Sequence, residues 1–97
     1  MFTITPDQRR FLRAAAHHLK PVVMISEAGL SPAVLKELAR TMGHHELIKV
    51  KVFSDDRKER ASLLQQMCEQ LEAAPVQHIG KILVIYKPAE KPVIQLP

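Results

Sequence analysis

Apolar side chains recur every three or four positions in three segments of the chain, the spacing that gives a helix one buried side. The first segment covers residues 7–19, the second begins at Ser31 and stops at Gly43, and the third runs over residues 56–73. In the second segment, serine at the N-cap is followed by Pro32 at the first helical position, and glycine ends the apolar stripe. We therefore predict three amphipathic helices.

Shorter apolar runs between and after these segments have the length of β-strands. In residues 47–53, apolar side chains alternate with Lys49 and Lys51, which predicts one face on the core and one face in solvent. The runs at 22–25 and 82–86 are apolar throughout, so we expect both to be buried on two faces. The first helix then covers only part of the face that carries the lysines.

The last two predicted strands, residues 76–79 and 82–86, are separated by Gly80 and Lys81. Glycine in the first position of a two-residue loop favours a type II′ hairpin, which makes these strands antiparallel neighbours. Strands that are joined through helices run parallel, with right-handed crossovers. The predicted fold class is therefore α/β, with the order α-β-α-β-α-β-β and a mixed four-stranded sheet.

The length of 97 residues is that of one domain. We assign residues 1–87 to it and residues 88–97, which hold three prolines and no periodicity, to a C-terminal tail without regular structure. The longest uncharged apolar run is far shorter than the roughly 20 residues that span a bilayer, and the N-terminus lacks a signal pattern. A single cysteine excludes the disulfide-rich secreted class. We expect a cytoplasmic protein that does not engage a membrane.

The formal net charge is +4, and the whole excess lies in the first half of the chain. Residues 1–54 hold eight lysine or arginine residues against four acidic ones, whereas residues 55–97 hold six of each. This asymmetry is expected of a surface that binds a polyanion. With 4% aromatic residues, the chain is not expected to read single strands mainly by stacking bases on aromatic rings. The candidates for phosphate contact are Arg9, Arg13, Lys20, Lys36, Arg40, Lys49 and Lys51.

The sequence carries no Walker loop, dinucleotide-binding fingerprint, nucleophile elbow or pair of catalytic carboxylates. Cys68 lies on the apolar stripe of the third predicted helix, where a buried structural thiol is expected. The histidine pairs 17–18 and 44–45 do not predict a metal site, because adjacent helical side chains point about 100° apart. We expect neither an enzyme nor a bound cofactor, metal or small-molecule substrate.

Several blocks in fixed order resemble the CRM domain family (chloroplast RNA splicing and ribosome maturation), in particular its stand-alone bacterial YhbY-type members. The resemblance covers about residues 6–87. The stretch His45-Glu46-Leu47-Ile48-Lys49-Val50-Lys51-Val52 is quite specific, because unrelated residue types recur there in order. The matching blocks are His18–Val23, Gly29–Ser31, His45–Val52, Val76–Lys81 and Ile85–Lys87.

The resemblance implies an RNA-binding fold similar to the C-terminal domain of bacterial translation initiation factor three. Stand-alone members are associated with precursors of the large ribosomal subunit, so ribosomal RNA and pre-large-subunit particles are the implied partners of a monomeric protein. The family carries a GxxG loop ahead of its second helix, similar to the loop that clamps nucleotide backbones in KH domains. Here the loop reads Ser26-Glu27-Ala28-Gly29, so that only Gly29 carries over and an acid enters the clamp.

Two functional hypotheses follow. In the first, the protein engages structured ribosomal RNA and assists large-subunit assembly. Its basic residues contact phosphates, the loop Ser26–Gly29 and the start of the second helix position one backbone segment, and recognition relies on shape more than on base identity. In the second, the chain is a protein-interaction module whose apolar sheet face or proline-rich tail docks on a ribosomal protein or an assembly factor.

Overall fold

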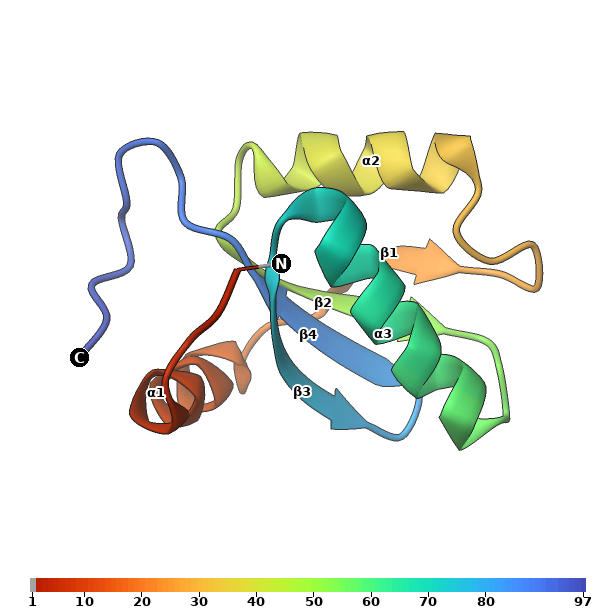
Figure 1. The fold of residues 1–97 in the computed structure, drawn as a ribbon, viewed down its shortest axis with the longest axis horizontal. Coiled ribbons are helices and arrows are strands. Elements are labelled where there is room, and N and C mark those ends of the chain that lie inside the picture. Colours follow the sequence, from red (N-terminus) through yellow and green to blue (C-terminus); the bar gives the residue numbers. More distant parts are fainter. Residues whose placement is uncertain (1) are drawn as a thin grey trace.

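The computed structural model describes residues 2–97, which form three helices and four strands (Figure 1). The predicted order α-β-α-β-α-β-β and the mixed four-stranded sheet are confirmed. Residues 88–97 form no helix or strand. In chain order the elements are α1 (Pro6–Ala16), β1 (Pro21–Ile25), α2 (Pro32–Met42), β2 (Leu47–Val52), α3 (Arg57–Leu71), β3 (Ala74–Ile79) and β4 (Ile82–Tyr86).

Local capping signals set where the helices begin. The Ser31 hydroxyl oxygen accepts a hydrogen bond at 3.2 Å from the N–H of Val34, as predicted for an N-cap. Thr5 caps α1 in a reciprocal capping box with Gln8, and the Asp56 carboxylate caps α3. Each cap satisfies an N–H group that has no partner within its own helix, so short local motifs set where the helices begin.

The strand order in the sheet is β1-β2-β4-β3. β1 and β2 run parallel and are joined through α2, whereas β2 and β3 are both antiparallel to β4. β2 and β4 are therefore the central strands, and β1 and β3 are the edges. In the β3–β4 hairpin, Gly80 has a φ of 53° and Lys81 is outside the positive-φ region, as a type II′ turn requires.

α2 and α3 lie together on one face of the sheet (Figure 1). The sheet contributes Ile25, Val50 and Leu83 to the core on this face, and the helices contribute Leu38 and Met67, all five with 0% exposure. Burial of a side chain of this size stabilises the folded state by about 1.5–3 kcal/mol relative to leaving it exposed. This face therefore carries a fully closed core.

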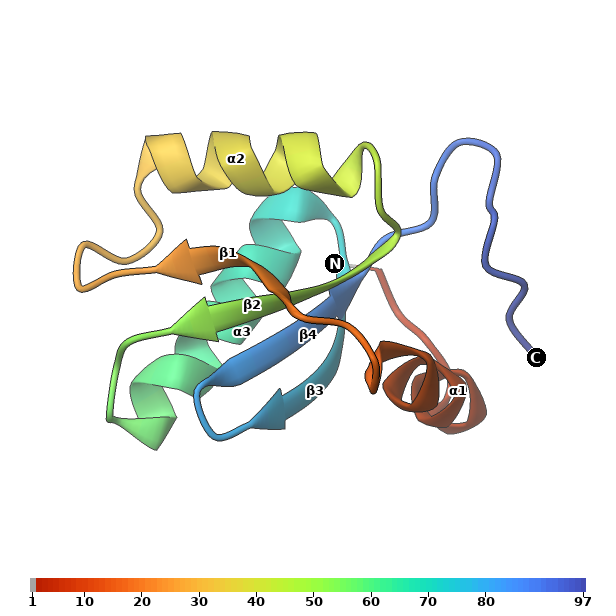
Figure 2. The same ribbon diagram turned by 180° about the vertical axis from the view of Figure 1, so that it is seen from behind.

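α1 covers only one end of the opposite face of the sheet (Figure 2). There Leu12 and Ala16 pack against a cluster that includes Leu47, Val84 and Tyr86. The other end of this face, next to the loop between β1 and α2, has no helix of residues 2–97 over it. The expectation that the first helix covers only part of the lysine face is confirmed.

The expectation that the first strand is buried on both faces was wrong. Val22 and Met24 are 53% and 54% exposed. The reason is that β1 is an edge strand, so α2 covers one of its faces and α1 does not reach the other. β4 is buried from Leu83 to Tyr86, as expected, because it is a central strand with helices on both sides.

α1 is shorter, and its buried side narrower, than the apolar spacing predicts. The helix ends at Ala16 rather than at Leu19, whose N–H donates to the carbonyl of Ala16 at 3.0 Å in a tighter turn. Phe11 and Leu19 are 42% and 37% exposed. Because α1 crosses only a corner of the sheet, it buries the single stripe of Leu12 and Ala16.

The tail packs against the body of the domain although it has no regular structure. The Glu46 carboxylate accepts hydrogen bonds from the N–H groups of Ala89, Val93 and Ile94 at 2.8, 2.9 and 2.7 Å. Ile94 also packs against the α1 side of the core. Burial by itself raises the pKa of Glu46, but the three N–H donors outweigh it and lower the pKa below its ordinary value. Glu46, 7% exposed, therefore anchors the tail.

Candidate nucleic-acid interface

The uncovered end of the sheet is lined by side chains from all four strands. The strand register aligns one side chain from each strand in a single row: Met24 of β1, Lys51 of β2, Ile82 of β4 and Ile79 of β3. We call this surface the bare face and define it by Met24, Lys49, Lys51, Phe53, Gln77, Ile79 and Ile82.

Three cations meet on or beside the bare face. Lys49 and Lys51 are two residues apart in β2 and therefore point to the same side of the sheet. Arg13 of α1 and Lys49 line one groove of about 200 Å³, together with His17 and Ile79. Within residues 2–97, none of these three cations forms a salt bridge. Their positive charge is therefore open to an external anion.

Arg9 and Arg13 do not lie where the helical periodicity placed them. The sequence predicts both on the side of α1 opposite its apolar stripe, whereas the structure turns both toward the sheet. Arg9 donates from Nε to the carbonyl of Pro75 at 3.3 Å and is half-buried, so it fastens α1 to β3. Arg13 remains exposed at the border of the bare face. Of the two, Arg13 is better placed to bind a phosphate.

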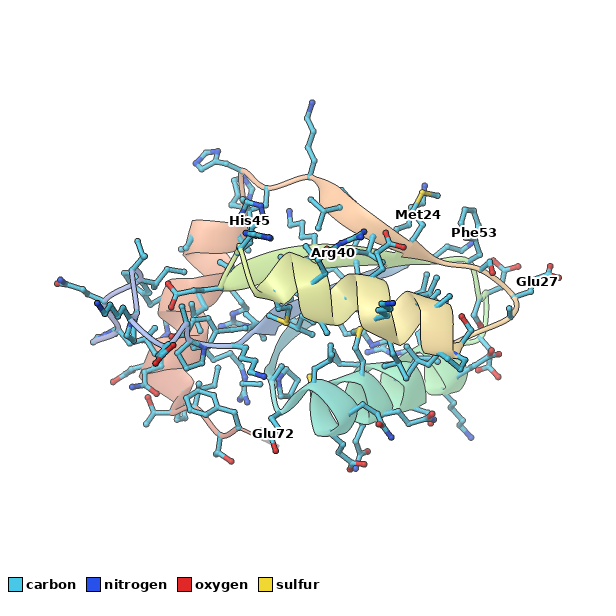
Figure 3. The ribbon with its side chains drawn as sticks, turned by 90° about the horizontal axis from the view of Figure 1, so that it is seen from above. Met24, Glu27, Arg40, His45, Phe53 and Glu72 are labelled. Atoms are coloured by element: carbon cyan, nitrogen blue, oxygen red, sulfur yellow. The ribbon has the colours of Figure 1, made fainter. Side chains whose placement is uncertain are left out.

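Lys20, Lys36 and Arg40 lie outside the bare face. Lys20 is exposed and immediately precedes β1. Arg40 lies on the side of α2 that is turned toward β1 (Figure 3), and Lys36 is exposed one helical turn before it. These three cations extend the positive charge around the β1 edge of the domain.

The loop Ser26–Gly29 leads from β1 into α2 beside the bare face (Figure 3). Gly29 has a φ of 72°, a backbone conformation that other residues rarely adopt. A Cβ atom added at this position would meet no other atom within 4 Å, so the backbone conformation and not a lack of space favours glycine. The Gly29 N–H donates to the carbonyl of Ser26 at 2.9 Å, and the Ala28 N–H donates to the hydroxyl of Ser26 at 3.4 Å. Because these two N–H groups are used within the loop, they are not free to bind a phosphate.

If the chain binds RNA, as the resemblance implies, the change Glu27→Lys is expected to tighten that binding several-fold at low salt. Glu27 is exposed at the tip of the loop (Figure 3), where its carboxylate repels a phosphate that approaches the N-terminus of α2. Solvent screening limits the gain to about fivefold, and it shrinks as salt rises. Filter binding at two salt concentrations measures both effects. Glu69→Lys on α3 adds the same charge elsewhere, and an equal gain from it would show that only net charge matters.

Local periodicity does not fully predict which apolar side chains of the bare face are exposed. Met24, Phe53 and Ile79 are 54%, 45% and 58% exposed. The Lys51 ammonium lies 5.8 Å from the centre of the Phe53 ring, within the range of a cation–π interaction. Met24 belongs to a run that looks like a core strand, whereas Phe53 follows Lys49 and Lys51 on the predicted solvent side of its run. The exposure of such apolar side chains depends on the order of the strands in the sheet, and local periodicity does not determine that order.

Cys68 is the residue with nucleophilic chemistry in the core. It is 0% exposed, and burial raises its pKa to about 12, so the thiol stays protonated. Cys68 therefore has the surroundings of a structural residue.

Within residues 2–97, no group of three or more His, Cys, Asp or Glu side chains is arranged to hold a metal ion. None of the helices in that range combines the length and the apolarity needed to cross a membrane.

Comparison with known proteins identifies the family. The CRS1 / YhbY (CRM) domain matches residues 4–87. An RNA-binding protein of Haemophilus influenzae is 46% identical over 97 residues, which cover 100% of this chain and 98% of that protein. The probable RNA-binding protein YqeI of Bacillus subtilis is 33% identical over 95 residues, covering 97% and 99%.

A solved structure shares both the fold and the sequence. It is the solution structure of a hypothetical Staphylococcus aureus protein, described as a candidate RNA-binding protein, with a TM-score of 0.88 and 32% identity. The match covers 98% of this chain and 100% of that one. The fold, the matching blocks and the relatives agree, and the chain belongs to the CRS1 / YhbY (CRM) domain family.

Proposed function

We propose that this chain is an RNA-binding protein that engages structured ribosomal RNA and assists assembly of the large ribosomal subunit, as a cytoplasmic monomer. One observation carries the proposal: Arg13 of α1 converges with Lys49 and Lys51 of β2 on one open surface, and within residues 2–97 none of the three pairs with a carboxylate. An open cationic surface on a small domain suits a polyanion. The names of the relatives point to RNA as that polyanion, and the resemblance to YhbY-type members implies ribosomal RNA.

Phosphate contacts supply the affinity in this proposal. Lys49 and Lys51 lie at the centre of the bare face and Arg13 at its border, so an RNA backbone that crosses the face meets all three. A lysine attracts phosphate as a point charge, whereas the planar arginine side chain can bind two oxygens at once. Structured RNA presents phosphates in a fixed arrangement, and a rigid sheet that holds cations recognises that shape without reading bases.

The start of α2 offers a second contact for the backbone. Ser31 caps the Val34 N–H, and Pro32 has no N–H to offer. The Ala33 N–H has no hydrogen-bond partner within residues 2–97, and the positive end of the helix lies there. A phosphate held at this point would lie beside Gly29, in line with the loop contact that the family resemblance implies.

Affinity for ribosomal RNA is expected to depend strongly on salt. If about four to six phosphates are neutralised, log K falls against log salt with a slope of about −3 to −5. Filter binding to ribosomal RNA over a series of salt concentrations gives the slope. A flat response would contradict the phosphate-contact proposal.

The exposed Met24, Phe53 and Ile79 favour a second candidate function, docking on a ribosomal protein or an assembly factor. Ribosomal RNA that has been stripped of its proteins distinguishes the two candidates. Retention of the chain on such RNA is required if the protein binds RNA. A chain that is retained on intact subunit precursors but not on stripped RNA would instead be a protein-interaction module.

A further inference from the structure

We propose that the bare face also receives unpaired nucleobases, so that the protein prefers an unpaired RNA segment beside a helix to the helix alone. This inference rests on the RNA-binding function proposed above, and it specifies which part of the RNA the bare face binds. It comes from the apolar side chains that share the bare face with the lysines, namely Met24, Phe53, Ile79 and Ile82.

The apolar side chains lie on both sides of a cation. In the row that crosses the sheet, Lys51 has Met24 on one side and Ile82 followed by Ile79 on the other. Three interstrand steps of about 4.8 Å make this row about 14 Å wide, which is room for a few nucleotides. Phe53 lies at the β1 end of the row, where its N–H donates to the carbonyl of Ile25 at 3.1 Å and its ring lies 5.8 Å from the Lys51 ammonium. The bare face thus alternates apolar surface with positive charge.

Charge distinguishes between RNA and protein as the occupant. The bare face and the groove beside it carry Arg13, Lys49 and Lys51, and among the described residues 2–97 no acidic one lines either of them. An apolar protein surface that docked here would bury two lysines at its centre, which costs free energy unless each finds a carboxylate. A single RNA strand offers a phosphate next to every base, so it matches lysines and apolar side chains together. The arrangement therefore favours RNA.

The bases must be unpaired to use the apolar side chains. In an RNA double helix the flat faces of the bases are stacked on one another, and only edges, sugars and phosphates reach the surface. An unpaired base exposes a face that can cover Met24, Phe53 or Ile79 and remove them from water. Phosphate contacts alone leave these half-exposed side chains without a partner.

A hairpin RNA with a short 3′ overhang tests the proposal with the full chain. It is compared with the same hairpin whose overhang nucleotides lack their bases, so that the number of phosphates stays constant. Fluorescence anisotropy at one salt concentration measures both affinities. The wild-type protein is expected to bind the intact overhang about five- to tenfold more tightly than the abasic one. In the double variant Met24→Ser/Ile79→Ser this ratio is expected to fall to about one.

Both substitutions fall at positions more than half exposed, so the core stays intact, and thermal melts verify that each variant is folded. Val93→Ser is the matched control, because Val93 is 82% exposed in the tail. It should keep the wild-type ratio. Equal wild-type affinity for the two hairpins overturns the inference and leaves the proposed function standing, whereas failure to bind either hairpin overturns both. A preference that survives in the double variant also overturns the inference, because the overhang bases then bind somewhere other than Met24 and Ile79.

Discussion

Changing Lys49 and Lys51 together to alanine is expected to weaken RNA binding by roughly 25- to 60-fold at about 0.1 M monovalent salt. Each phosphate contact releases about 0.7–0.9 of a counterion, and at this salt concentration each release contributes about that many powers of ten to the binding constant. The slope of log K against log salt should become shallower by about 1.4–1.8. Titrations of ribosomal RNA at several salt concentrations measure both quantities.

The matched control removes the same charge from another part of the surface. Lys58 in the first turn of α3 and Lys91 in the tail are both exposed and lie outside the bare face. The double variant Lys58→Ala/Lys91→Ala should lose much less affinity and keep nearly the wild-type slope. If the two double variants lost affinity equally, net charge rather than the bare face would account for the binding.

Glu46→Ala is expected to lower the free energy of unfolding by about 2–3 kcal/mol and to release the tail. The carboxylate accepts three backbone N–H groups of the tail at 2.7–2.9 Å, and hydrogen bonds to a charged group contribute more than neutral ones. The loss is limited because the tail can detach, and its N–H groups then bond to water. Denaturant unfolding gives the loss, and hydrogen exchange at Ala89, Val93 and Ile94 reports the release.

The same interaction makes stability depend on pH. The folded-state pKa of Glu46 is lower than the ordinary value of 4.5, because the three N–H donors outweigh the effect of burial. Its contribution is therefore fully present above pH 4.5 and is lost as the pH falls through the folded-state pKa. Glu46→Ala should remove this part of the acid sensitivity.

Glu90→Ala is the control for the tail anchor, because Glu90 is an exposed acid in the same segment. It should leave both the unfolding midpoint at neutral pH and the exchange of the tail amides close to wild type. If Glu46→Ala behaved like Glu90→Ala, the tail would be held by its apolar contacts through Ile94 and Leu96 instead.

Local signals were enough to predict the elements and their order. Ser31 with Pro32 marked the start of α2, and Gly43 marked its end, because a cap acts on N–H or carbonyl groups within one turn. The alternation around Lys49 and Lys51 predicted which side of β2 meets solvent, because side chains alternate along any strand. The basic residues of the candidate interface could also be identified from the sequence, because charge is a property of each residue.

Contacts between distant segments decided the remaining features. Met24 looks like a core residue in the sequence, and it is exposed because β1 lies at the edge of the sheet, beyond the reach of α1. Arg9 and Arg13 are alike in the sequence, yet one is tied to Pro75 while the other borders the bare face. Glu46 is buried and accepts N–H groups from residues 43 to 48 positions farther along the chain, which no local pattern around it predicts. Burial and hydrogen bonding of these residues depend on which segments meet in space, and periodicity along the chain does not contain that information.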